Sequence, residues 1–150
     1  MYRFCRIGTT NLICYRNGTI LRQHESSKKW HICGTKLKNE YIQIKILKRN
    51  FMCHRIISYA FGILDNIYSD LVIDHRDRNP SNNCIFNLRA VTPQQNSFNT
   101  NAKGYYWNKK DKRWLARIKI NGKGIFLGRF DKEEDARKAY LDSKKIYHII

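Results

Sequence analysis

The stretch "VIDHRDRNPSNNCIFNLRAVTPQQN", residues 72–96, constrains the fold more than any other part of the chain. Two short apolar runs, "LVID" and "NLRAV", flank a loop rich in asparagine, and each run has the length and composition of a β-strand. "TPQQ" then marks a helix start, with Thr92 as N-cap, Pro93 at the first helical position and Gln95 completing a capping box. The stretch therefore predicts a strand, a long loop, a second strand and a helix in succession.

The composition points to a polyanionic partner. The chain has 150 residues, 42% of them hydrophobic, and a formal net charge of +17 that is spread over its whole length. A folded chain with this charge favours nucleic acid. An anionic membrane surface is the weaker alternative, because no long basic amphipathic helix is present. No apolar run approaches the ~18 residues of a membrane span, and "MYRFCRIGTT" lacks the apolar region of a signal peptide, so we expect an intracellular protein without membrane contact.

Five cysteines stand at positions 5, 14, 33, 53 and 84. Their number is odd, and no C-x-x-C occurs, whereas a zinc knuckle normally needs closely spaced ligand pairs. We therefore predict reduced core thiols in preference to a structural zinc site.

The N-terminal 50 residues predict antiparallel β-hairpins. "NLICYRNGTILRQ" alternates on both sides of Asn17-Gly18, a dipeptide that suits a type I′ turn. "YIQIKILKRNFMC" predicts a second hairpin with its turn at residues 48–50. "CHRIISYAFG" follows as a short helix, with Gly62 as the residue just past its end.

The C-terminal third predicts a sheet and a helix. In "RWLARIKINGKGIFLGRF", Asn121-Gly122 marks a tight hairpin. One face of the hairpin is apolar and buried, and it comprises Trp114, Ala116, Ile118, Ile120, Ile125 and Leu127. The polar face of the first strand carries Arg117 and Lys119, and Phe126 falls on the same side. Asp131 is predicted to cap a helix whose inner stripe is Ala136, Ala139, Tyr140 and Ser143. The whole chain is therefore expected to be α+β.

The first stretch also carries chemistry. If its helix packs across the hairpin, Asp74 and Asn96 offer two oxygen ligands to a hard divalent ion, with room left for water and phosphate oxygens. Histidine is the residue type that exchanges a proton near neutral pH, so His75 could take a proton from an attacking water. Asn87 could bridge the loop ends and hold the backbone of the histidine.

"IDHRDRNPSNNCIFNLRAVTPQQN" resembles the motif of the HNH endonucleases, and "CHRIISYAFG" resembles the segment that precedes it in phage intron-encoded homing endonucleases of that family. The resemblance implies a ββα-metal nuclease unit over residues 51–100, with His75 as general base and Asn87 as the residue that braces the hairpin. It also implies Asp74 and Asn96 as metal ligands. Since oxygen donors stand where zinc-binding members have histidines, Mg²⁺ or Mn²⁺ is favoured over zinc.

Residues 104–150 resemble the DNA-binding domain of plant ethylene-response (APETALA-type) factors, through "WLARI" and "FLGRFDKEEDARKAY". The resemblance implies a three-stranded sheet that enters the DNA major groove, with a helix behind it. Residues 1–50 are expected to contact DNA as well. Predicted DNA contacts at the start of the "CHRIISYAFG" helix are Arg55 and His54. For His54, packing or a phosphate contact is favoured over metal ligation. The predicted DNA contacts in the C-terminal domain are Arg117, Lys119, Phe126, Trp107, Lys109, Lys112 and Arg113.

Together these features predict a monomeric, metal-dependent homing-type endonuclease that nicks double-stranded DNA in the cytoplasm or nucleus of a host cell, without an obligate protein partner. Two alternatives remain. The first is a catalytically inactive, sequence-specific DNA-binding regulator, which the presence of all four catalytic residue types argues against. The second is an RNA-binding module, which would leave His75 unexplained and which has no RRM-type aromatic signature here.

Overall fold

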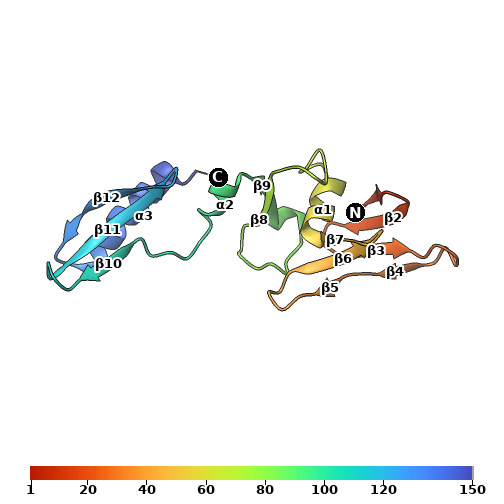
Figure 1. Cartoon of the computed structure of the whole chain (residues 1–150), viewed down its shortest axis with the longest axis horizontal. Coiled ribbons are helices and arrows are strands. Elements are labelled where there is room, and N and C mark those ends of the chain that lie inside the picture. The colour runs from red at the N-terminus through yellow and green to blue at the C-terminus, as the bar shows by residue number, and fades with distance from the viewer. Residues whose placement is uncertain (150) are drawn as a thin grey trace. The chain divides into compact units, whose positions relative to one another are not determined.

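The computed structural model describes residues 1–149; Ile150 lies outside the described residues. The chain divides into two compact units, Met1–Asn96 and Ser97–Ile150, which are described one at a time. The predicted α+β class is confirmed, since several antiparallel sheets are combined with a few helices (Figure 1). None of the helices within residues 1–149 is both long and apolar enough to span a membrane.

The first unit begins with two antiparallel sheets. The four-stranded sheet has the order β1-β2-β3-β4 and the three-stranded sheet has the order β5-β6-β7. Their strands are β1 (Tyr2–Ile7), β2 (Thr10–Tyr15), β3 (Ile20–Gln23), β4 (Trp30–Ile32), β5 (Thr35–Lys36), β6 (Ile42–Ile46) and β7 (Arg49–Met52). Both predicted hairpins, β2–β3 and β6–β7, are present.

The turns of these two hairpins differ from the predicted ones. In the β2–β3 turn only Gly18 has a positive φ, at 92°, so the turn is not type I′, and the backbone N–H of Thr19 donates to Asn17 Oδ1 at 3.0 Å. In the β6–β7 turn the left-handed residues are Leu47 and Lys48, with φ of 46° and 67°. This turn starts one residue before the predicted one and joins strands that pair Ile46 with Arg49, a register that leaves Ile46 in the core.

Helix α1 (Cys53–Ala60) packs its buried side on these sheets. Cys53, Ile56 and Ile57 are buried. Gly62 takes a φ of 77° just past the helix end, as predicted, and a Cβ there would be strained. All five cysteines are free thiols. Burial raises the pKa of Cys53 to about 12, so its thiol is neutral and behaves as a small apolar side chain.

The motif that opened the sequence analysis folds as predicted. Strand β8 (Val72–His75) pairs antiparallel with β9 (Leu88–Val91), a 3-10 turn at Ile85–Asn87 precedes β9, and the short helix α2 (Pro93–Asn96) follows it. Both hydrogen bonds of the capping box form: Gln95 N–H donates to Thr92 Oγ1 at 3.2 Å, and Thr92 N–H donates to Gln95 Oε1 at 3.0 Å.

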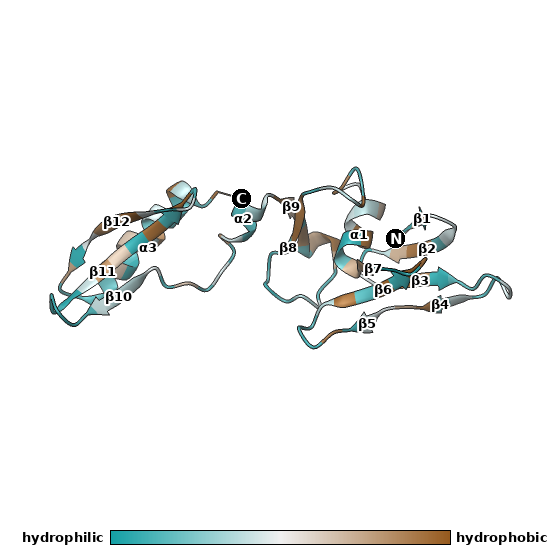
Figure 2. Cartoon of the chain, viewed as in Figure 1, coloured by the Kyte–Doolittle hydropathy of each residue, from teal (hydrophilic) through white to brown (hydrophobic). Residues whose placement is uncertain are grey.

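One hydrophobic core joins these elements. Figure 2 shows hydrophobic stretches in α1, β8 and β9, and the core contains residues of α1 and of the strands β1, β2, β3, β6, β7, β8 and β9. Ile73 of β8 and Leu88 of β9 belong to the same buried cluster as Leu12 of β2 and Ile46 of β6. The boundary predicted at residue 50 therefore falls inside a compact unit, and the division at residue 96 falls inside the predicted 51–100 segment.

The second unit is a three-stranded antiparallel sheet with a helix on one face, as predicted. Its elements are β10 (Tyr105–Asn108), β11 (Arg113–Ile120), β12 (Lys123–Phe130) and α3 (Glu133–Tyr147). Ala136 and Tyr140 of α3 are buried, as are Ala116 and Ile118 of β11, against which the helix packs. Gly104 has a φ of 68°, and a Cβ there would lie 2.0 Å from the Tyr140 ring, so only glycine fits.

Two predictions for this unit are wrong. The N-cap of α3 is Lys132, without a side-chain cap, because Asp131 instead pairs with Arg113 at 3.2 Å. The alternation of β12 is also interrupted. Ala116 lies opposite Gly128 and Arg117 lies opposite Phe126, so Leu127 is an extra residue.

This β-bulge changes which side chains share a face. Ile125 lies opposite the buried Ile118, on the helix side, but at the edge strand it is still 41% exposed. Beyond the bulge Arg129 lies opposite Leu115, on the face of Arg117. Simple alternation from Ile125 would have assigned Arg129 to the helix side.

Candidate active site

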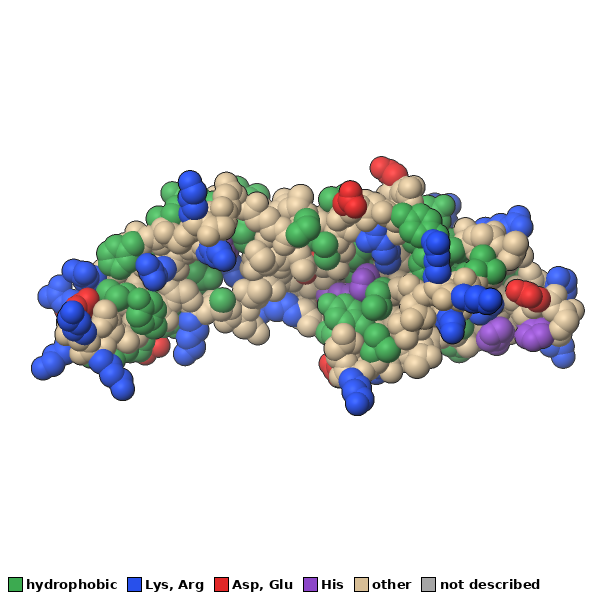
Figure 3. Space-filling view, viewed as in Figure 1, with side chains coloured by type: hydrophobic (Ala, Val, Ile, Leu, Met, Phe, Trp, Pro, Cys, Tyr) green, Lys and Arg blue, Asp and Glu red, His purple; other side chains and the backbone are tan. Residues whose placement is uncertain are grey.

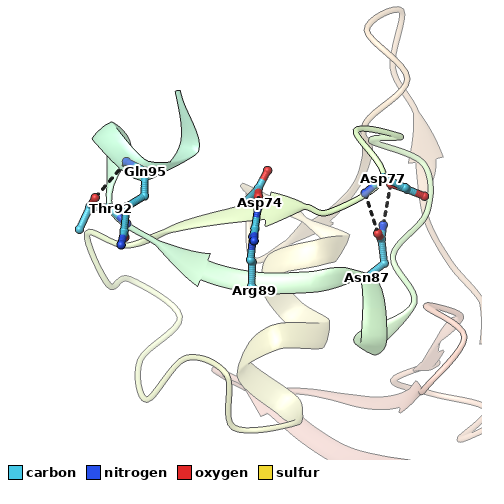
Figure 4. Close-up of polar contacts among 6 residues, drawn as sticks. All are labelled: Asp74, Asp77, Asn87, Arg89, Thr92 and Gln95. Carbon is cyan, nitrogen blue, oxygen red and sulfur yellow. Dashed lines mark hydrogen bonds and ion pairs between the residues drawn. The ribbon is translucent and has the colours of Figure 1, made fainter. Parts of the chain in front are cut away.

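The loop between β8 and β9 is closed by a pair of reciprocal hydrogen bonds. Asn87 Nδ2 donates to Asp77 Oδ1 at 2.9 Å, and the backbone N–H of Asp77 donates to Asn87 Oδ1 at 3.0 Å (Figure 4). The backbone N–H of Arg76 donates to the Asn87 carbonyl at 2.9 Å. Asn87 is buried and thus ties the two residues after His75 to the far end of the loop.

Asp77 organises the rest of the loop. Its carboxylate also accepts from Asn79 N–H at 2.8 Å and from Asn82 Nδ2 at 2.7 Å. Desolvation opposes the charged form, but these hydrogen bonds, together with that from Asn87, lower the pKa of Asp77 below its usual value. Asp77 was not predicted as a site residue. The Asp-x-Asn pattern of residues 77–79, typical of an Asx turn, is the signal that identifies it.

Asp74 forms a buried ion pair across the strands. It lies opposite Arg89, whose Nη2 and Nε approach Asp74 Oδ2 at 2.7 Å and 2.8 Å. The Asp74 side chain is only 6% exposed and that of Arg89 is 20% exposed. Figure 4 shows this pair between the Asp77–Asn87 brace at one end of the hairpin and the capping box at the other. Arg89 was not predicted as a site residue, because its importance depends on strand register.

His75 is buried in a polar and aromatic environment. Its Nε2 lies 3.1 Å from Asn83 Oδ1. The His54 ring meets it edge to face, with centroids 5.1 Å apart, and the Tyr41 ring lies 5.9 Å from it.

His54 is therefore a neighbour of His75. Among residues 1–149, no hydrogen-bond partner is found for the buried Nδ1 atom of His54. Burial, followed by the nearby His75 and Arg55, lowers the pKa of His54 to about 3, so its ring is neutral near pH 7. A neutral, packed ring suits the packing alternative better than the predicted contact with DNA phosphate.

Arg55 also makes a contact different from the predicted one. Its Nη1 donates to the Leu71 carbonyl at 2.8 Å, and Nε and Nη2 donate to the carbonyls of Ile67 and Ser69. The guanidinium thus holds the segment between α1 and β8 in place. The structure shows this structural contact, and the DNA contact of Arg55 stays a prediction.

The two predicted metal ligands, Asp74 and Asn96, both offer oxygen atoms. Asn96 is the last residue of α2, which packs against β8, the strand of Asp74. Mg²⁺ is commonly bound through one or two protein oxygens, with waters and phosphate completing its shell. Within residues 1–149 no group of three His, Cys, Asp or Glu is arranged to hold a metal, so the zinc-type ligand set is not formed there. The chemistry of this donor set fits Mg²⁺ or Mn²⁺.

The open face of the C-terminal sheet gathers three of the predicted DNA contacts. Arg117 lies opposite Phe126 and Lys119 lies opposite Gly124, and all three predicted side chains are exposed. Arg129, which the sequence analysis missed because of the bulge, lies 5.9 Å from the centre of the Phe126 ring. Figure 3 shows Lys and Arg side chains prominent on the visible surface of this unit.

The other predicted contacts lie elsewhere in the second unit. Trp107 lies opposite Trp114, on the helix side of the sheet, with ring centroids 5.6 Å apart. Lys109 and Lys112 lie in the exposed turn between β10 and β11. Arg113 is on the open face but pairs with Asp131. The structure thus separates Trp107 from Arg117, Lys119 and Phe126.

Comparison with known proteins identifies the β8–β9–α2 region. Residues 52–98 match the family model described as HNH endonuclease. The chain carries an HNH endonuclease domain. It is 39% identical over 93 residues to an uncharacterized HNH endonuclease, L560, of Acanthamoeba polyphaga mimivirus, covering 58% of this chain and 48% of that protein. It is 36% identical over 59 residues to Protein 3.8 of Escherichia phage T7, covering 34% of this chain and 49% of that one.

The chain thus spans about half the length of these two relatives. A solved structure describes DNA binding and cleavage by the HNH homing endonuclease I-HmuI. It is 22% identical to this chain, and the match covers 85% of this chain and 75% of that chain, with a TM-score of 0.49. The family match ends at residue 98, so the resemblance of residues 104–150 to ethylene-response factors stays a prediction.

Proposed function

We propose that this protein is a metal-dependent endonuclease that hydrolyses phosphodiester bonds in double-stranded DNA. One observation supports it above all. Asp74 and His75 lie next to each other at the end of β8, each 5% exposed, within the segment that matches the HNH endonuclease family. Buried polar groups that are fixed by their neighbours are expected where chemistry needs a preformed geometry.

In this proposal His75 removes the proton from the attacking water. Asn87 and Asp77 hold the loop that follows His75, so the imidazole keeps its place relative to β8. Asp74 and Asn96 would hold Mg²⁺ or Mn²⁺. The metal, when bound, supplies charge for the scissile phosphate and the leaving oxygen. Arg89 pairs with Asp74 Oδ2 and holds the carboxylate in its orientation.

DNA would be held by the positive charge of both units. In the second unit, Arg117, Lys119 and Phe126 would lie against a groove, which is the arrangement expected of an ethylene-response-factor-like sheet. Arg129 extends this surface. A single HNH site in a monomer would cut one strand at a time, so we propose nicking.

The test is cleavage of supercoiled plasmid by the full chain, with Mg²⁺, Mn²⁺ or Zn²⁺ and with EDTA. We expect open-circular product with Mg²⁺ or Mn²⁺, little with Zn²⁺, and none with EDTA. The matched pair of variants is His75→Ala, which should not cut, and His31→Ala, an exposed histidine on β4, which should cut as the wild type does. Binding of DNA without cleavage under any metal would favour the inactive regulator instead.

A further inference from the structure

The side chains of His75 and Asn83 are both buried and in contact, and this contact determines which nitrogen of the His75 ring carries the hydrogen. Asn83 is 3% exposed and His75 is 5% exposed, and Asn83 Oδ1 lies 3.1 Å from His75 Nε2. A carbonyl oxygen only accepts hydrogen bonds, so Nε2 must carry the hydrogen. In a neutral imidazole the other nitrogen, Nδ1, then carries the lone pair.

We propose that Asn83 is a positioning residue that holds His75 in the tautomer with its hydrogen on Nε2, which makes Nδ1 the atom that accepts the proton of the attacking water. The catalytic meaning of this proposal rests on the proposed nuclease function. The tautomer itself does not.

Asn83 is held in place from outside the loop. A Cβ at Gly18, in the turn between β2 and β3, would lie 2.7 Å from the carbonyl carbon of Asn83, so the backbone of this turn touches Asn83 directly. The backbone N–H of Ile85 donates to the Arg16 carbonyl at 2.9 Å, which ties the same turn to the loop two residues further on. The N-terminal hairpin thus supports the back of Asn83.

The imidazole is also confined at its sides. The rings of His54 and Tyr41 both meet His75, and they meet each other with centroids 5.4 Å apart. The three rings form one cluster, so a rotation of His75 about its side-chain bonds would displace its neighbours. Packing therefore fixes where the ring lies, and Asn83 decides which nitrogen carries the hydrogen.

The direct test is long-range ¹H–¹⁵N correlation NMR of the full-length protein with ¹⁵N-labelled histidine, at a pH about two units above the ordinary histidine pKa of ~6.5. We expect the wild-type His75 to show hydrogen on Nε2. A wild-type signal from the tautomer with hydrogen on Nδ1 would overturn the proposal, because the amide nitrogen of Asn83 would then be the donor.

Three variants distinguish loss of the His75–Asn83 hydrogen bond from a general disturbance of the loop. Asn83→Leu removes the acceptor and should give a mixture of tautomers, whereas Asn83→Asp keeps an acceptor and should keep the wild-type tautomer. Asn82→Leu is the matched control, because Asn82 bonds Asp77 and Cys84 and has no such bond to His75. If Asn83→Leu does not fold, Asn83→Ala serves in its place. A wild-type tautomer in the folded Leu or Ala variant would contradict the role of Asn83.

Cleavage then tests the catalytic meaning. We expect Asn83→Leu to lower kcat about tenfold or more, with KM within about threefold, and Asn83→Asp to recover most of the rate. If the wild type does not cut DNA, the proposed function fails while the NMR result still decides the tautomer. If the wild type cuts and Asn83→Leu cuts equally fast, the positioning role is wrong and the nuclease function stands.

Discussion

The loop between β8 and β9 and the open face of the C-terminal sheet are both polar, but their side chains interact differently. In and around the loop, Asp74, His75, Asn83 and Asn87 are buried, and each is bonded to a neighbour in the Asp74–Arg89, His75–Asn83 and Asp77–Asn87 contacts. On the sheet, Arg117 and Lys119 are exposed side chains around an exposed Phe126.

This difference suits the first region to the cleavage reaction and the second region to DNA binding. Groups that act on a reacting atom must be held to a fraction of an ångström before the substrate arrives, and buried reciprocal hydrogen bonds do this. Cations that contact phosphate gain from release of counterions along a long polyanion and need no fixed geometry beforehand. Substitutions in the first region should therefore change the rate of cleavage, and substitutions in the second should change affinity.

The largest effect is expected at the proposed metal ligands. Asp74→Ala and Asn96→Ala should each lower Mg²⁺-supported cleavage by at least about 100-fold, because the charge that stabilises the leaving oxygen is lost. The measurement is the single-turnover nicking rate as a function of Mg²⁺ and Mn²⁺ concentration. The matched control is Gln94→Ala, an exposed position of the same short helix, which should keep the wild-type rate. Full activity in either ligand variant would show that the metal is bound elsewhere or not used.

A smaller effect, on binding alone, is expected at the C-terminal sheet. Arg117→Ala should cost about 1–3 kcal/mol of DNA affinity and relax the preference at one base pair, whereas Lys112→Ala should weaken binding to all sequences and lower the salt slope by about one unit. Both are measured by titration of a selected and a random duplex at several salt concentrations. Equal losses on both duplexes for Arg117→Ala would show that the sheet contacts only phosphates.

The smallest effect concerns His54 and the pH dependence of stability. The pKa of His54 is lowered from 6.5 to about 3. Between these two pH values, His54 binds a proton in the unfolded chain but not in the folded chain. Stability from this group is complete above about pH 6.5 and decreases as the pH falls toward 3. His54→Phe should therefore reduce the loss of unfolding free energy between pH 7 and pH 5 by about 2 kcal/mol.

Urea unfolding at the two pH values measures this difference, with His31→Phe, at an exposed position, as the control. An identical pH dependence in wild type and His54→Phe would mean that the His54 ring is more hydrated than the structure indicates.

The sequence predicted what depends on local pattern. The two strands around the polar loop, the Thr92–Gln95 capping box and the Asn121-Gly122 turn were all found where short-range chemistry specifies them. The asparagine spacing also identified Asn87 as a bridge across the loop, and its hydrogen bonds to Asp77 close that loop.

The features that the sequence did not predict depend on contacts between residues far apart in the chain. Arg89 becomes a partner of Asp74 only through strand register, and Asn83 reaches His75 only because the loop folds back and Gly18 supports it. The bulge at Leu127 moves Arg129 to the open face, although period-two alternation assigns it to the other. His54 and Arg55 are adjacent polar residues whose inward contacts with His75 and with the 67–71 carbonyls are set by tertiary packing.

The most direct test of the central claim is to measure cleavage and binding of the same DNA by wild type and His75→Ala. If the buried β8–β9 region performs the chemistry and the exposed surfaces hold the DNA, the variant should lose about 10²- to 10⁴-fold in cleavage rate while its Kd stays within about threefold. Cleavage by His75→Ala at more than a tenth of the wild-type rate would contradict the role of His75 and, with it, the assignment of the catalytic site to this region.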